Sequence, residues 1–67
     1  MGWNYRVMRK GDQFAIHEVF YREDGSIQGF TESPVFPRAE GVEQLAEELK
    51  HYALAIEKPV LPYEPAL

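Results

Sequence analysis

The chain has 67 residues, of which 45% are hydrophobic, and its seven basic and eleven acidic side chains give a formal net charge of −4. This length suits one small domain, and the acidic balance argues against nucleic-acid binding, which relies on a basic surface. The absence of cysteine excludes disulfides and cysteine-based zinc sites, and no apolar run reaches the roughly 18 residues of a membrane span. We therefore expect a small cytoplasmic protein without membrane contact.

Two strands joined by a tight turn are predicted near the start of the chain. Residues 3–10 alternate in polarity, and residues 13–21 are rich in β-branched and aromatic side chains. The Gly-Asp pair at 11–12 suits a two-residue type II′ turn, because glycine readily adopts the positive φ that the first central position requires. A turn of this length determines the register of the hairpin and places Trp3 opposite Phe20.

A third antiparallel strand is predicted at residues 27–31. The preceding residues 22–26, REDGS, are typical of a turn in which Gly25 takes the left-handed conformation. This turn would pair Glu18 with Phe30. The three strands would then form an antiparallel meander in which each strand lies beside its neighbour in sequence.

Residues 42–57 form the predicted helix, which follows a proline-containing loop at residues 32–41. Its apolar side chains recur at the spacing of one helical stripe, namely Val42, Leu45, Ala46, Leu49, Tyr52, Ala53 and Ile56. Gly41 is the expected N-cap, and the proline-rich tail, residues 58–67, is expected to be extended. The predicted fold is α+β, a three-stranded antiparallel β-meander with one C-terminal α-helix packed across it, in a single domain covering residues 1–67.

The two faces of this sheet differ, because successive residues of a strand point to opposite sides. One face carries large aromatic groups, among them Trp3, Tyr5 and Phe30, and we expect the helix to cover it because it offers the larger apolar area. Glu18 lies on the same face, where an unpaired carboxylate is costly. Either the Tyr5 hydroxyl, the Trp3 indole N–H or an arginine satisfies it, or it is a polar anchor in an aromatic binding surface.

The opposite face is expected to stay uncovered, because one helix about 10 Å wide covers only one face of a sheet. It forms a predicted interaction surface that consists of Arg6, Met8, His17, Val19, Tyr21 and Ile27. Two copies that stack these faces, or that join strand edges, would form a homodimer. Alternatively, the tail folds back over this surface and keeps the chain monomeric.

No group of side chains predicts a catalytic, cofactor or metal site. His51 lies one helical turn after Glu47 and Glu48, but these residues supply too few metal ligands, and a solvated helix face explains them better. His17 is expected across from Arg6, either as a hydrogen-bonded structural histidine or as a proton-transfer group. The sequence therefore predicts that the protein is not an enzyme.

Several stretches of the chain resemble a family of short bacterial proteins for which no activity is established. Its members share a WNYRV opening, an IHEVYY strand, a DEDG turn, a TExPV motif and an acidic helix followed by KPVL. The matching residues are 3–7, 16–19, 21, 23–25, 31–32, 34–35 and 58–61. Phe20 stands where the family usually has Tyr, and Gly41 stands where Ser or Thr commonly leads the helix. The resemblance covers nearly the whole chain and implies little about function.

Two classes of function remain open. The first is a small, non-catalytic cytosolic protein-interaction module that acts as a homodimer or through another protein partner. The second is an acidic regulatory protein of antitoxin or inhibitor type, which blocks a basic partner. In favour of the second, the order of elements is similar to the strand-strand-strand-helix half of HicB-type antitoxins. If the proteins that bind this chain were mainly lysine-rich or nucleic-acid-binding proteins, the second class would be favoured over the first.

Overall fold

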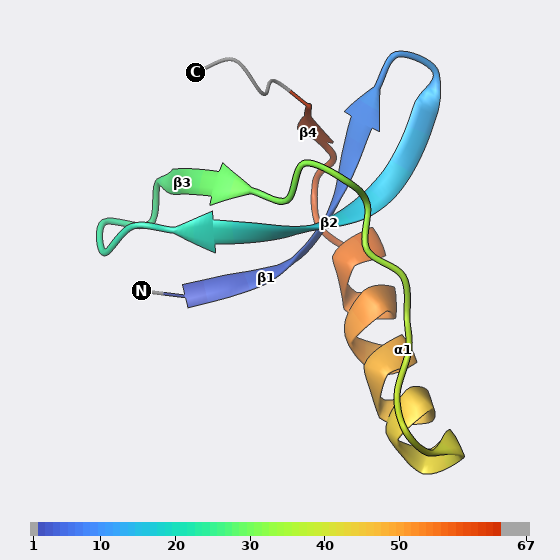
Figure 1. Ribbon diagram of the computed structural model, residues 1–67. Coiled ribbons are helices and arrows are strands. Elements are labelled where there is room, and N and C mark those ends of the chain that lie inside the picture. The colour runs from blue at the N-terminus through green and yellow to red at the C-terminus, as the bar shows by residue number, and fades with distance from the viewer. Residues whose placement is uncertain (1, 64–67) are drawn as a thin grey trace.

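The computed structural model describes residues 2–63 and shows one curled sheet with a helix beside it (Figure 1). Its elements are β1 (Gly2–Lys10), β2 (Gln13–Tyr21), β3 (Ile27–Phe30), α1 (Val42–Ile56) and β4 (Leu61–Pro62). The strand order is β3-β2-β1-β4. The α+β class is therefore confirmed. The sheet is mixed and four-stranded rather than three-stranded and antiparallel, because β4 joins β1 in parallel.

The β1–β2 hairpin has the predicted register. Lys10 pairs with Gln13 across the turn, and Trp3 pairs with Phe20 near the far end. Gly11 has a φ of 63°, as the first central position of a type II′ turn requires. Among residues 2–63, only glycines have a positive φ. Local turn chemistry therefore explains the pairing of the two longest strands.

The β2–β3 pairing differs from the prediction by one residue. Ile27 pairs with Tyr21, but Phe30 pairs with Val19 rather than with Glu18. Gln28 is the additional residue of a bulge, and one additional residue transfers every side chain beyond it to the opposite face. Phe30 therefore lies on the Val19 face, and its expected place on the aromatic face beside Tyr5 was wrong.

The helix begins at Val42, as predicted, and packs against the sheet through its C-terminal half. Its buried residues are Tyr52 and Ala55. Val42 is 84% exposed and Leu49 is 49% exposed, so the predicted apolar stripe coincides with the contact face at Tyr52 but not at these two residues. Figure 1 shows the reason, because α1 points away from the sheet and approaches the strands only with its C-terminal part.

The helix lies on the side of the sheet that carries Tyr5, as expected. The rings of Tyr5 and Tyr52 are 4.4 Å apart between centroids. Within residues 2–63, no helix is long and apolar enough to cross a membrane. The helix therefore contributes a short contact with β1 rather than a lid over the whole sheet.

Buried side chains also lie on the other face, which was expected to stay bare. Met8, His17 and Val19 are all buried there. The tail returns along β1 so that Tyr63 lies over this face, with its ring centroid 5.5 Å from that of His17 and 5.2 Å from that of Phe30. The expectation of an uncovered face was wrong at its centre, because the bulged third strand and the returning tail both supply aromatic cover.

Candidate functional site

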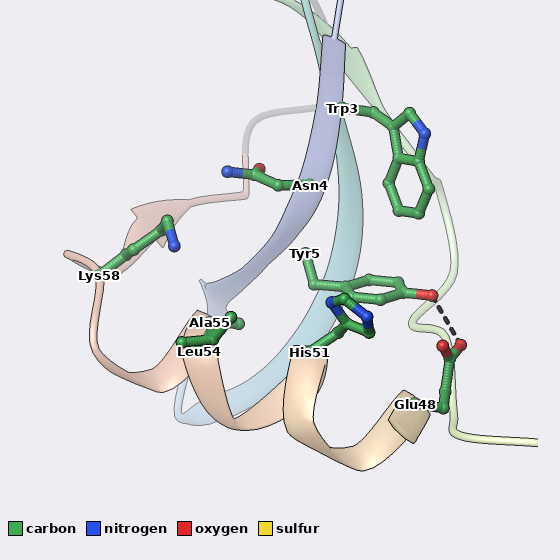
Figure 2. A pocket seen from close by; sticks show the side chains of 8 residues that line it. All are labelled: Trp3, Asn4, Tyr5, Glu48, His51, Leu54, Ala55 and Lys58. Carbon is green, nitrogen blue, oxygen red and sulfur yellow. Dashed lines mark hydrogen bonds between the residues drawn. The ribbon is translucent and has the colours of Figure 1, made fainter. Parts of the chain in front are cut away.

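A groove of about 520 Å³ lies between the N-terminal half of β1 and the C-terminal half of α1. Figure 2 shows Trp3 and Tyr5 on one side of β1 and Asn4 on the other, with the helix at the end of the groove. The helix contributes Glu48, His51, Leu54 and Ala55 to the lining. The groove therefore combines a strand edge with aromatic and aliphatic walls.

The aromatic wall of the groove is held by contacts around Tyr5. The Tyr5 ring meets Trp3 edge to face, with 5.3 Å between the centroids, and its hydroxyl donates a 2.8 Å hydrogen bond to Glu48 Oε2. Burial, this hydrogen bond and the negative charge of Glu48 raise the pKa of Tyr5 far above its ordinary value of 10.0. Burial also raises the pKa of Tyr52, and the negative charges of Glu48 and Glu18 raise it further. Both hydroxyls therefore stay neutral and fix the wall beside Trp3.

Tyr5→Phe should lower the free energy of unfolding by about 2 kcal/mol at pH 7, because a partly buried hydrogen bond to a carboxylate is lost. The folded-state pKa of Tyr5 is raised, so its contribution is complete below about pH 10 and is lost as the pH rises above that value. Urea titrations at pH 7, 10 and 11.5 should therefore show that the difference between wild type and Tyr5→Phe shrinks at the highest pH. A difference that stays constant across this range would contradict the assignment.

The outer edge of β1 follows a simple hydrogen-bonding rule. In a hairpin with a two-residue turn, the pair that flanks the turn exchanges backbone hydrogen bonds, and such pairs alternate with pairs whose N–H and C=O groups point away from each other. Lys10 and Gln13 flank the turn, so the odd-numbered residues of β1 point away from β2. The Arg9 carbonyl obeys this rule, because it accepts a 2.9 Å bond from the Tyr63 N–H.

Trp3 and Tyr5 consequently direct their backbone N–H and C=O groups into the groove. Within residues 2–63, the strand that pairs with this edge is β4, and it does so only at Met8 and Arg9. The stretch Gly2–Tyr5 contains no proline and no charged residue, which are common protections of an exposed edge. The floor of the groove is therefore an open strand edge that can accept a further strand.

The predicted interaction surface is divided between covered and accessible residues. Met8, His17 and Val19 are buried, whereas Ile27 is exposed at the start of β3. Arg6 bridges the sheet and the tail, because its Nη1 donates to the Tyr21 hydroxyl over 3.1 Å and its Nη2 donates to the Pro59 carbonyl over 2.8 Å. Tyr21 donates in turn to Asn4 Oδ1. These residues hold the chain's own tail rather than forming one open patch.

His17 lies opposite Arg6, as the predicted register requires. Its Nδ1 is 2.9 Å from the Thr31 carbonyl oxygen. A carbonyl only accepts hydrogen bonds, so Nδ1 carries the proton in this contact. The ring is also buried between Phe30 and Tyr63. These contacts support the structural role of His17 over that of a proton-transfer group.

Glu18 lies outside the groove, in a second cavity on the same side of the sheet. It lines this cavity of about 320 Å³ together with Glu48, Tyr52 and Arg38. The Tyr5 hydroxyl, one of its expected partners, donates to Glu48 instead. The side chain of Glu18 is half-buried, and its charge contributes to the raised pKa of Tyr52. The role of Glu18 as a polar anchor stays a prediction.

Glu48 and Leu54 line the groove but were not predicted as residues of a site. Neither residue belongs to the apolar stripe that hydrophobic spacing predicts. Glu48, Tyr52 and Ala55 nevertheless share one face of the helix, because Glu48 precedes Tyr52 by one turn and Ala55 follows Tyr52 by about one turn. A stripe through these three positions would have located the contact face, had a carboxylate been allowed on it. Trp3 was expected to be covered by the helix, whereas it is 55% exposed at the groove.

His51 also faces the groove rather than a cluster of metal ligands (Figure 2). Among residues 2–63, no group of three or more His, Cys, Asp or Glu side chains is placed to hold a metal ion. The groove is therefore the feature of the described chain that combines accessible apolar side chains with unpaired backbone groups. No family model, no curated protein and no solved structure matches the chain, so its function is argued from this geometry.

Proposed function

We propose that the protein is a non-catalytic protein-interaction module that binds an extended segment of a protein partner in the groove beside β1. The observation that carries the proposal is the position of Trp3 and Leu54. These side chains are 55% and 50% exposed, and both line the groove beside an open strand edge. An apolar groove next to unpaired backbone groups provides the two kinds of contact that this type of binding needs, namely apolar side-chain contacts and main-chain hydrogen bonds.

The backbone groups of Trp3 and Tyr5 would supply the main-chain hydrogen bonds of strand addition. In this mode of recognition, main-chain bonds give affinity, and pockets for alternate side chains give specificity. Trp3 and Leu54 would supply the apolar contacts, and tryptophan is among the residues that contribute most at protein interfaces. The neutral, internally bonded Tyr5 hydroxyl holds its ring in place before binding. A preorganised wall reduces the entropy that binding costs.

The test is site-specific photocrosslinking in cells that produce the full chain. A benzophenone amino acid replaces Leu54 at the groove or, as a control, the exposed Gln28 on β3. We expect a discrete protein adduct from position 54 at least about fivefold more abundant than from position 28. Equal yields from both positions, or no adduct from position 54, would contradict the proposal.

A second candidate is an acidic regulatory protein that blocks a basic partner, and the surface of α1 favours it. Glu43 and Glu47 are exposed on the helix, and the one salt bridge among residues 2–63 joins Lys50 to Glu47. Glu47 therefore has a cationic partner, whereas Glu43 forms no salt bridge with another of residues 2–63. Binding driven by the carboxylates of this surface should weaken steeply between 0.1 and about 0.5 M salt, because salt screens exposed charges. An adduct at position 54 whose yield is insensitive to salt would support the groove instead.

A further inference from the structure

We propose that the occupant of the groove is a second copy of this chain, joined through antiparallel pairing of β1 with β1 about a two-fold axis at Asn4. This inference rests on the proposed function, because it names the partner for the same groove. A two-fold interface uses the same patch on both copies, so the open edge must be complementary to itself. The alternation of backbone groups along β1 meets this requirement.

The pairing follows from which residues point outward. Trp3 and Tyr5 both direct their backbone groups away from β2, and Asn4 between them is bonded inward. If Asn4 lies on the axis, Trp3 of each copy faces Tyr5 of the other, and all of these outward N–H and C=O groups find partners. A shift toward Val7 would meet the tail, because Leu61 already pairs with Met8 beside it.

The side chains and charges agree with this register. Paired residues of adjacent strands share one face, so each Trp3 would lie next to the other copy's Tyr5 on the helix side, which adds an aromatic pair. Each chain has a net charge of −4, but Gly2–Tyr5 carries no charged side chain. Two acidic copies can therefore approach along this stretch without placing like charges opposite each other.

The other free edge of the sheet is less suitable. β3 has only four residues, and the bulge at Gln28 interrupts its pairing. Short and bulged edge strands are common devices against edge-to-edge association. The N-terminal part of β1 has neither feature and also opens into a groove with exposed Trp3 and Leu54. This difference between the two edges selects β1.

The short contact predicts a weak dimer. Pairing over so few residues buries less than the roughly 1,600 Å² of a standard interface, so we expect a dissociation constant on the order of 10 μM. A chain of 67 residues with few buried apolar side chains gains stability from such mass action. Self-association should therefore raise the melting temperature with concentration.

The decisive experiment measures mass and amide hydrogen exchange on the unmodified full chain. Sedimentation equilibrium should show a shift from monomer to dimer between about 1 μM and about 1 mM. The amides of Trp3 and Tyr5 should exchange about fivefold more slowly at about 1 mM than at about 20 μM, while the amides of β3 should not change. A monomer mass at 1 mM, or a dimer in which only β3 amides slow down, would overturn the inference.

A matched pair of variants tests the backbone contact directly. Trp3→Pro removes an N–H that makes no bond to β2, so the hairpin should persist while the chain becomes monomeric. Trp3→Val keeps this N–H and should weaken the dimer without abolishing it. A dimer that survives Trp3→Pro would contradict the pairing, and if this variant fails to fold, the exchange data decide. A monomeric chain whose position 54 still crosslinks to a different protein would refute the second copy but leave the proposed function standing.

Discussion

Val19→Asp should unfold the protein. Val19 is fully buried on β2, between Asn4 on β1 and Phe30 on β3. An unpaired carboxylate in this position costs more than about 4 kcal/mol, which equals or exceeds the stability of a domain this small. Circular dichroism at 25 °C should therefore show the loss of the native spectrum and of a cooperative thermal transition.

The control for this substitution is Val42→Asp, which makes the same chemical change at a residue that is 84% exposed. Val42 is the first residue of α1, where a negative charge interacts favourably with the helix dipole, so stability should change by less than about 0.5 kcal/mol. The comparison also tests which face is covered. If the Val19 face were bare in the monomer, Val19→Asp would be tolerated almost as well as the control.

Tyr63→Ala should lower the free energy of unfolding by about 3 kcal/mol, the amount typical for removal of a packed aromatic ring. The ring of Tyr63 contacts His17 and Phe30, and its hydroxyl donates a 3.0 Å bond to the Glu32 carbonyl. Its backbone N–H also bonds to Arg9, which the substitution leaves intact. Urea denaturation at pH 7 would measure the loss.

Tyr63→Phe separates the ring from the hydroxyl. It keeps the contacts with His17 and Phe30 and removes the bond to Glu32, so we expect a loss of about 1 kcal/mol. Equal stabilities for the alanine and phenylalanine variants would show that the ring does not cover the sheet. A large difference would establish that the tail stabilises the face opposite the helix.

The register of β1 and β2 could be predicted because it depends on neighbours in sequence. The Gly-Asp turn at 11–12 forces Lys10 against Gln13, and every later pair follows from that contact. The start of α1 is equally local, since Gly41 adopts an extended conformation as N-cap and Val42 begins the helix. These features need no information from distant parts of the chain.

The face assignments failed where one residue or one long-range contact decides. The sequence around the second turn is compatible with Phe30 opposite Glu18, and only the bulge at Gln28 moves it opposite Val19. The helical stripe failed in part for a related reason. Leu49 and Tyr52 both have the right spacing for core positions, but α1 leans away from the sheet, so Tyr52 is buried and Leu49 is not.

The groove could not be predicted from the pattern of residues in the sequence. Its floor consists of backbone groups of Trp3 and Tyr5, and whether an edge is open depends on where a distant segment ends its pairing. Its walls come from β1 and α1, which are separated by more than thirty residues in sequence. The hydrogen bond from Tyr5 to Glu48 joins these two elements, and hydrophobic periodicity does not register a carboxylate as a contact residue.

The amino-acid sequence by itself determined the α+β class, the first hairpin with its register and the start of the helix. Turn geometry and backbone hydrogen bonding settle these features within a few residues of chain. Only the tertiary structure decided between a bare face and the alternative in which the tail returns to β1 and shields Met8 and His17, and only it showed that Trp3 stays exposed at an open edge. A proline-rich tail makes few local hydrogen bonds of its own, so its place is chosen by the aromatic rings and the carbonyl groups that it meets.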